Sequence, residues 1–223
     1  MENSGKIERS AGILMHISSL PSPFGIGTFG KTAYEFVDFV AQARHRYWQV
    51  LPLGPTTYGD SPYQSYSAFA GNPYFVDLEI LTDDGILDRN IYEDIDWGSG
   101  DYVDYEKVYN NRFTVLHEAY KNYRQKLSES RVKLAAGLPE YKKFDNFNKT
   151  NAYWLDDYAL FMALKWHFNQ KSWQDWDEDI KFRTQKGRRI KNCLQTKSDS
   201  GSLSSMNLIN NGKNSKNMPM KIM

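Results

Sequence analysis

The order of apolar and polar positions near the N-terminus predicts a strand, a helix and a second strand. Residues 11–18, AGILMHIS, form a short apolar run typical of a buried strand, and a Gly- and Pro-rich loop follows it. In residues 31–46, Tyr34 and Val37 belong to a set of apolar positions at helical spacing. Residues 47–55, YWQVLPLGP, predict another buried strand that ends at Gly-Pro. A strand, a helix and a strand in this order indicate parallel pairing, the start of an α/β sheet or barrel.

The next segment has neither helical nor strand periodicity. Residues 60–75, DSPYQSYSAFAGNPYF, place five aromatic residues and two prolines among small polar ones. This composition predicts a long, shaped loop directly after the second strand. The overlapping residues 72–81, NPYFVDLEIL, predict a short extended segment.

Two helical patterns follow the loop. Residues 104–134 are polar but carry aromatic and apolar residues at steps of three and four, and residues 153–170 show a similar stripe. The stripes consist of Tyr109, Phe113, Leu116 and Tyr120, and of Leu155, Tyr158, Phe161, Met162 and Lys165. Because crossover connections are usually shorter, these helices indicate an insertion between strands.

The expected organisation therefore has four parts. They are an N-terminal tail (1–10), the first βα units with the aromatic loop (11–103), a helical insertion subdomain (104–187) and a C-terminal tail (188–223).

Composition narrows the possible partners. The net charge of the 223 residues is +1, so no excess positive charge indicates nucleic acid or anionic lipid as a partner. No apolar run reaches the roughly 18 residues of a membrane span, and the polar start, MENSGKIERS, lacks a signal-peptide core. We therefore expect a cytoplasmic protein. The aromatic content of 15% is high, and Tyr and Trp suit partly hydrated binding surfaces.

Several chemistries have little support in the sequence. Cys193 is the only cysteine, and the four histidines lie in separate elements without metal-ligand spacing, so neither a disulfide framework nor a metal site is expected. The glycines of GIGTFG (25–30) resemble a phosphate loop, but the Lys-Ser/Thr ending is missing. We expect no cofactor.

Four motifs together resemble one family. They are AGILMHISSLPSPFGIGTFG, YWQVLPLGPT, YGDSPYQSYSAFAGNPYFVDLEIL and WLDDYALFMALK, in this order, within about residues 10–187. They are similar to the N-terminal part of the 4-alpha-glucanotransferases, also called amylomaltases or disproportionating enzymes. Two small departures are Ile17, where a proline commonly follows the histidine, and His45-Arg46 before the second strand.

The resemblance implies the N-terminal fragment of a (β/α)₈ TIM barrel, with the aromatic loop at its catalytic face. It implies that Tyr63 and Ser61 contact the glucan near the cleavage point and that Tyr58 lines a secondary glucan contact. Asp60, Gln64 and Asn72 are expected to hold the loop in shape. The implied partners are maltooligosaccharides or other α-1,4-glucans.

The implied reaction is transfer of a 1,4-α-glucan segment to a sugar 4-hydroxyl with retention. It needs a nucleophilic carboxylate and a carboxylic acid about 5 Å apart. In this family both are expected beyond the end of this chain, so we assign no catalytic residue and expect the chain alone to be inactive. Asp60, Asp77, Asp83 and Asp84 are interpreted as caps and turn formers. The alternatives are a non-catalytic glucan-binding module and a helical interaction protein that uses residues 104–170.

The C-terminal tail differs from the rest of the chain. Residues 188–223 contain no Phe, Tyr or Trp, and 17 of these 36 positions are Ser, Asn or Lys. One choice of codons, read from the third base of the Ile190 codon, gives an aromatic, helix-forming product that resembles the family's next segment. We therefore predict a change of reading frame near codon 187 and a non-native, disordered tail, with a genuine disordered tail as the alternative.

A sheet of two or three such strands has a physical consequence. Parallel strands are apolar on both faces, so without the other strands of the barrel they would keep an open edge and an uncovered surface. We expect such a chain to be unstable or prone to aggregation.

Overall fold

A computed structural model describes residues 9–133, 139–182 and 221–222; the side chains of 127–133, 139–145 and 221–222 are not described. The helices are α1 (Lys31–Gln42), α2 (Leu78–Asp83), α3 (Tyr105–Lys133), α4 (Pro139–His167) and α5 (Glu178–Lys181). The strands are β1 (Gly12–Leu14), β2 (Tyr47–Gln49) and β3 (Lys221–Ile222). Short 3₁₀ turns lie at η1 (Ile17–Ser19), η2 (Pro73–Phe75), η3 (Arg89–Ile91) and η4 (Trp173–Asp175).

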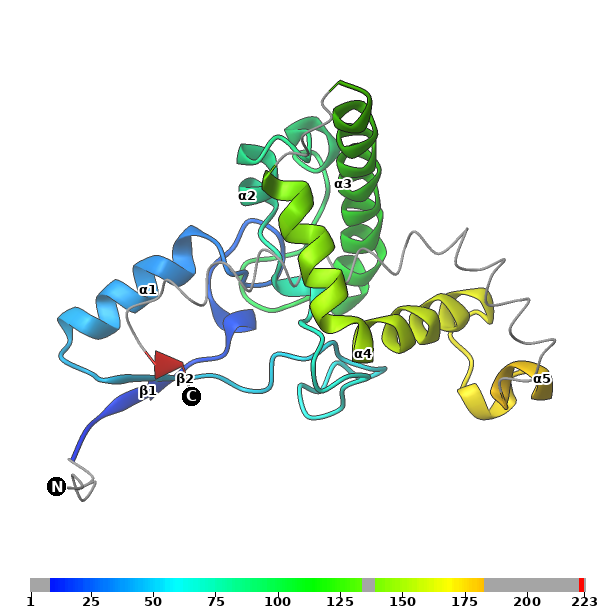
Figure 1. Ribbon diagram of the computed structural model, residues 1–223. Helices are drawn as coiled ribbons and strands as arrows, with labels where there is room; N and C mark the ends of the chain where they lie inside the picture. Colours follow the sequence, from blue (N-terminus) through cyan, green and yellow to red (C-terminus); the bar gives the residue numbers. More distant parts are fainter. Residues whose placement is uncertain (1–8, 134–138, 183–220, 223) are drawn as a thin grey trace, which may run out of the picture.

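The first two strands pair in parallel, with Gly12 opposite Tyr47 and Leu14 opposite Gln49. Helix α1 lies between them in the chain and next to them in space (Figure 1). The predicted strand–helix–strand unit is confirmed, but both strands are shorter than predicted, since the chain turns into η1 soon after Leu14. The described residues thus form an α/β arrangement. Strand β3 extends the sheet by pairing with β2; it belongs to the predicted tail 188–223, whose other residues lie outside the described ones.

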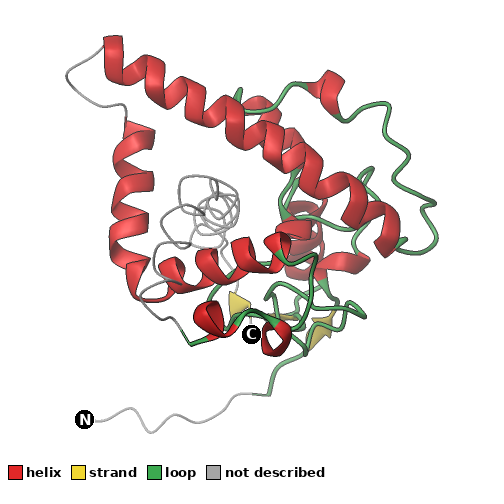
Figure 2. Cartoon of the chain, turned by 90° about the vertical axis from the view of Figure 1, so that its right-hand side faces the viewer, coloured by secondary structure: helices red, strands yellow, loops and turns green. Residues whose placement is uncertain are grey.

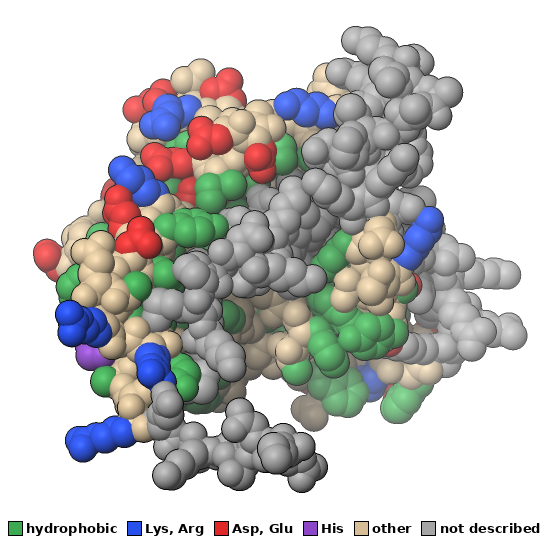
Figure 3. All heavy atoms as spheres, turned by 60° about the vertical axis from the view of Figure 1, so that its left-hand side comes forward, with side chains coloured by type: hydrophobic (Ala, Val, Ile, Leu, Met, Phe, Trp, Pro, Cys, Tyr) green, Lys and Arg blue, Asp and Glu red, His purple; other side chains and the backbone are tan. Residues whose placement is uncertain are grey.

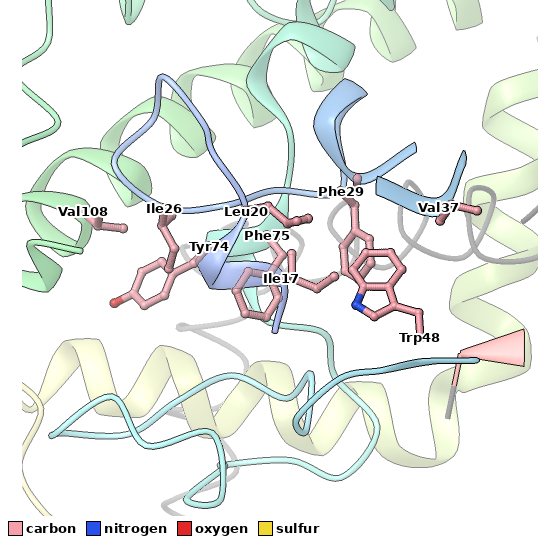
Figure 4. Close-up of a cluster of buried hydrophobic side chains, with 10 residues drawn as sticks. Ile17, Leu20, Ile26, Phe29, Val37, Trp48, Tyr74, Phe75 and Val108 are labelled. Carbon is pink, nitrogen blue, oxygen red and sulfur yellow. The ribbon is translucent and has the colours of Figure 1, made fainter. Parts of the chain in front are cut away.

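The core beside the sheet is built from the loops as much as from the strands. Trp48, on β2, is fully buried, and its indole Nε1 donates to the Met15 carbonyl at 2.7 Å. Figure 4 shows Trp48 beside Phe29, with Ile17 and Phe75 toward the centre of the same cluster. Burying these side chains removes apolar surface from water, which fixes the loop after β1 against the sheet.

Strand β1 is less buried than the sequence predicted. Its Leu14 side chain is 58% exposed, and Phe39 on α1 is 57% exposed. Among the described strands, β1 pairs only with β2, so its other edge is open. This agrees with the expected uncovered surface of a short parallel sheet.

The prediction of an extended segment at residues 72–81 is wrong. The chain forms η2 and then α2, because polar side chains cap both turns. Asn72 Oδ1 accepts from the Tyr74 amide at 3.0 Å, and Asp77 Oδ1 accepts from the Ile80 amide at 3.1 Å. Such caps satisfy free amides at helix starts, and they override the β-type residues in NPYFVDLEIL.

The predicted helix at 104–134 is confirmed as α3, and the one at 153–170 is the C-terminal part of the longer α4. Figures 1 and 2 show that α4 changes direction part-way along its length, while α3 is a long straight rod beside it. The loop of residues 55–72, cyan in Figure 1, lies next to the bend in α4.

Charged side chains mix on the surface. In Figure 3, acidic and basic groups are interspersed over the upper part of the visible face, with hydrophobic groups below them. Opposite charges also pair locally, as between Glu79 and Arg89 at 3.8 Å and between Asp96 and Lys107. None of the helices formed by the described residues combines the length and apolar character needed to cross a membrane.

Candidate active-site loop and aromatic cavity

The loop after β2 folds back on itself as a short hairpin. Thr56 and Ser65 form an antiparallel bridge, and the Thr57 amide donates to the Gln64 carbonyl at 3.1 Å. The hairpin turns at Gly59 and Asp60, whose φ angles are +95° and +54°. Glycine adopts this left-handed region freely and aspartate tolerates it, which explains why Gly-Asp occupies the tip.

Serine side chains shape the second half of the loop. Ser65 Oγ donates to the Ser67 carbonyl at 2.8 Å, while Ser67 Oγ accepts from the amides of Phe69 and Ala70 at 3.1 and 3.0 Å. Gly54 packs so close that a Cβ there would lie 2.4 Å from Ser65 Oγ. The small residues Gly54, Ser65 and Ser67 therefore stabilise the folded conformation of this loop.

A cavity of about 1240 Å³ lies between this loop and helices α3 and α4. One wall comes from Tyr105, Tyr109 and Phe113, which recur at four-residue steps on α3. Tyr158, Met162 and Trp166 on α4 supply the facing wall, and Tyr66 and Tyr74 from the loop and η2 complete the lining.

The rings of the two helices contact each other. The Tyr109 and Trp166 rings lie nearly parallel, with an interplanar angle of 12° and centroids 6.1 Å apart. The Phe113 ring meets the Trp166 ring edge-on, with centroids 5.6 Å apart. It is tilted relative to the Tyr74 ring, with centroids 6.0 Å apart. Tyr109 and Trp166 are 37% and 43% exposed, so this aromatic wall keeps ring surface available to a ligand.

Lys165 lies in the last turn of α4 and lines the cavity. Its Nζ donates to the carbonyls of Gln170 and Lys171 at 2.6 and 3.1 Å and lies 5.5 Å from the centre of the Tyr66 ring. The ammonium group thus satisfies carbonyls beyond the helix end, where a positive charge is favourable. Burial lowers the pKa of Lys165.

Arg112 does not line the cavity but hydrogen-bonds to Tyr74, which does. It is fully buried on α3, with its guanidinium 5.7 Å from the Phe24 ring and 5.4 Å from the Trp97 ring. Its Nη2 donates to the Tyr74 carbonyl at 2.8 Å, which ties η2 to α3. Burial lowers the pKa of Arg112 to about 10, against the opposing charge of Asp77.

The structure brings three of the sequence-predicted residues to the cavity and leaves three outside its lining. Tyr58, Asp60 and Asn72 line it, whereas Ser61, Tyr63 and Gln64 do not. The Tyr58 ring is fully exposed at the loop tip, and Tyr63 is 73% exposed. The glucan contacts assigned to Tyr58, Ser61 and Tyr63 stay predictions.

The residues expected to shape the loop make internal hydrogen bonds. Thr56 Oγ1 donates to Asp60 Oδ1 at 3.3 Å, and Thr57 Oγ1 donates to Gln64 Oε1 at 3.5 Å. The Asn72 side chain caps η2, and its amide donates to the Leu53 carbonyl at 2.8 Å. These bonds lie within the loop and its base, where a shaping role would place them.

Sequence reasoning missed the helical wall of the site. The stripes that carry Tyr109 and Phe113 and Tyr158 and Met162 predict helices but not a cavity wall, and Trp166 belongs to neither predicted stripe. A helical period indicates which residues share a face, but it does not indicate whether that face meets a core or a cavity. No described residues form a group of three or more His, Cys, Asp or Glu suited to a metal ion.

The comparisons with known proteins decide the family. The family model described as 4-alpha-glucanotransferase matches residues 15–205. The chain belongs to the 4-alpha-glucanotransferase family. A 4-alpha-glucanotransferase from Clostridium butyricum is 51% identical over 170 residues, which cover 76% of this chain and 32% of the relative. One from Thermus thermophilus is 42% identical over 184 residues, 82% of this chain and 34% of the relative.

Solved structures agree with this family. An amylomaltase from Streptococcus agalactiae in complex with acarbose matches with a TM-score of 0.79 and 32% identity, over 96% of this chain and 42% of that one. The chain spans about a third of the length of the curated 4-alpha-glucanotransferases that it matches. The family match extends past residue 187, into the segment predicted to be read out of frame.

Proposed function

We propose that this chain is the N-terminal glucan-binding part of a 4-alpha-glucanotransferase (β/α)₈ barrel, with a helical insertion subdomain between its strands. The whole enzyme would transfer 1,4-α-glucan segments between maltooligosaccharides with retention. Within this chain, the aromatic cavity between the loop and helices α3 and α4 would bind the glucan.

The observation that carries the proposal is the aromatic lining of the cavity. Pyranose rings present C–H faces that pack on aromatic rings, and Tyr adds a hydroxyl that bonds to sugar hydroxyls. A volume of about 1240 Å³ exceeds the range of roughly 300–1,000 Å³ typical of drug-sized ligands. This size suits an oligosaccharide better than a single sugar.

The chain alone is proposed to bind without transferring. Retaining transfer needs two carboxyl groups about 5 Å apart. The cavity is lined by Glu106 and Glu118, but they are twelve residues apart on α3, about 18 Å at 1.5 Å per residue. That pair cannot act as nucleophile and acid, and one oxygen of Asp60, Oδ1, already accepts from Thr56 Oγ1.

Titration with maltoheptaose tests the binding. We expect saturable binding, with Trp166→Ala weakening it about tenfold because a large stacking surface is lost. Trp173→Ala is the matched control, since Trp173 is 50% exposed and does not line the cavity. Cellohexaose, with β-1,4 links, should bind more weakly. Equal affinity of the Trp166 and Trp173 variants would refute the cavity as the binding site.

The same cavity also favours the second candidate, a glucan-binding module without a catalytic role. The two proposals differ in whether the chain is a part of a larger enzyme or acts as a binding module by itself. A gene in which the frame near codon 187 is restored by one base distinguishes them. Its product should release glucose from maltotriose if the chain is part of a transferase, and should bind maltoheptaose without releasing glucose from maltotriose if the chain is a module.

A further inference from the structure

Asp60 has a position that loop shaping alone does not require. It lines the cavity at the tip of the hairpin, where its left-handed conformation, with φ +54°, fits the turn. A turn needs that backbone conformation, but it does not need a carboxylate at the cavity.

Only one oxygen of its carboxylate is used. Oδ1 accepts from Thr56 Oγ1, while among the described residues Oδ2 has no hydrogen-bond partner. The group is partly withdrawn from water, and burial raises the pKa of Asp60 against the opposing Thr56 hydrogen bond. Oδ2 is not among the buried unpartnered atoms of the described residues, so it is accessible to accept a hydrogen bond from a ligand hydroxyl in place of water.

The charge of the carboxylate acts on tyrosines from two different elements. Burial raises the pKa of Tyr74 on η2 and of Tyr105 on α3, and the negative charge of Asp60 raises both further. Both tyrosines line the cavity. Asp60 and the two tyrosines thus line one cavity, and this combination of a charged acceptor and stacking faces matches a sugar ring, which has hydroxyls at its rim and C–H groups on its faces.

We propose that Asp60 is a specificity-determining residue: its Oδ2 accepts a hydrogen bond from a glucose hydroxyl of the glucan in the aromatic cavity. Its Oδ1 meanwhile holds the hairpin through Thr56. This inference rests on the proposed glucan-binding function of the cavity. It adds a recognition role to the loop-shaping role that the sequence predicted.

Asp60→Asn separates the two roles. Asparagine has the same shape, tolerates the left-handed conformation and retains Oδ1 for Thr56, but it replaces the charged acceptor by an amide donor. The matched control is Asp88→Asn, because Asp88 Oδ1 also accepts a single local hydrogen bond, from the Asn90 amide, and lies outside the cavity lining. Circular dichroism and thermal melting establish that both variants are folded like the wild type.

The ligands are methyl α-maltoside and its series of monodeoxy analogues, each titrated by NMR. The wild type should lose about tenfold in affinity for at least one analogue, the expected value of a charge-assisted hydrogen bond. Asp60→Asn should bind the parent maltoside about tenfold more weakly and no longer distinguish that analogue. Asp88→Asn should behave like the wild type.

Three results would overturn the inference. The first is unchanged affinity of Asp60→Asn for the parent maltoside. The second is an equal loss for the parent and for every analogue, which a purely structural role would give. In both cases the binding by the wild type leaves the proposed function standing. The third is absence of binding by the wild type, which overturns the proposed function as well.

Discussion

At the scale of single residues, His16 lies just after β1 and connects that end of the strand to the segment after β2. The side chain is 9% exposed, its Nδ1 accepts from the Leu51 amide at 3.2 Å, and its ring meets Phe75 edge-on at 5.3 Å. Burial lowers the pKa of His16 below its ordinary 6.5. The folded chain therefore keeps this imidazole neutral at pH values where the unfolded chain protonates it.

This difference makes stability depend on pH. The contribution of neutral His16 is fully present above pH 6.5 and decreases as the pH falls from 6.5 toward the folded pKa, by at most about 1.4 kcal/mol per pH unit. Urea unfolding at pH 7.5 and 5.5 should show a smaller decrease for His16→Asn, which retains an acceptor but does not titrate. An equal decrease in both proteins would show that His16 does not contribute.

Arg112 is expected to matter through its hydrogen bond and ring contacts rather than through its charge alone. Arg112→Met keeps much of the volume but leaves the Tyr74 carbonyl without its donor. We expect the free energy of unfolding in urea to fall by about 1–3 kcal/mol. Arg89→Met is the control: Arg89 pairs at the surface with Glu79, and such pairs contribute about 0–1 kcal/mol. Equal effects of the two substitutions would contradict the supporting role of Arg112.

At the scale of elements, the open edge of β1 predicts association between copies of the chain. Within the described part of the chain, β1 pairs only with β2, and the backbone groups at its other edge, beside the exposed Leu14, form a template for another strand. Leu14→Lys should reduce aggregation, measured by light scattering over a range of protein concentrations, because charge on an edge strand opposes pairing. Phe39→Lys removes a similarly exposed side chain from α1 and should reduce it less. If the helix variant is the more soluble one, the edge is not the site of association.

The same elements show what the sequence could predict. The apolar runs predicted β1 and β2, and the helical stripes predicted α1 and α3, because the spacing of apolar residues fits the type of each element. Residues 72–81 form turns rather than the predicted extended segment, because Asn72 and Asp77 stabilise these turns through side-chain caps that leave no periodic pattern in the sequence. The exposure of β1 depends on which elements cover it, and that is a property of the assembled fold.

The candidate site was predictable only on its loop side. The aromatic loop stood out because its composition fits no regular element, and Tyr58 and Asp60 on it do line the cavity. Tyr109 and Trp166 face each other from helices α3 and α4, about 57 residues apart in the chain, and nothing local in the sequence specifies their meeting. Long-range packing of this kind requires coordinates.

At the scale of the whole molecule, the predicted change of reading frame near codon 187 has a functional consequence. The cavity that we propose to bind glucan is built from residues 55–170, before that codon. The carboxylates of retaining transfer are expected after it. Binding and turnover are therefore separable: the chain should bind maltoheptaose but release no glucose from maltotriose. A gene in which the frame is restored by one base should yield a protein that does both.

Glucose release from maltotriose, together with longer glucans, measures this turnover. The preparation of the present chain must be free of any host glucanotransferase, and a preparation from cells with the empty vector gives the background. Resequencing around codon 187 decides the frame itself, and an unchanged sequence there would mean that the family match as far as residue 205 reflects native protein. Glucose release above background by the present chain would contradict the separation, because the acid and the nucleophile would then have to lie within these 223 residues.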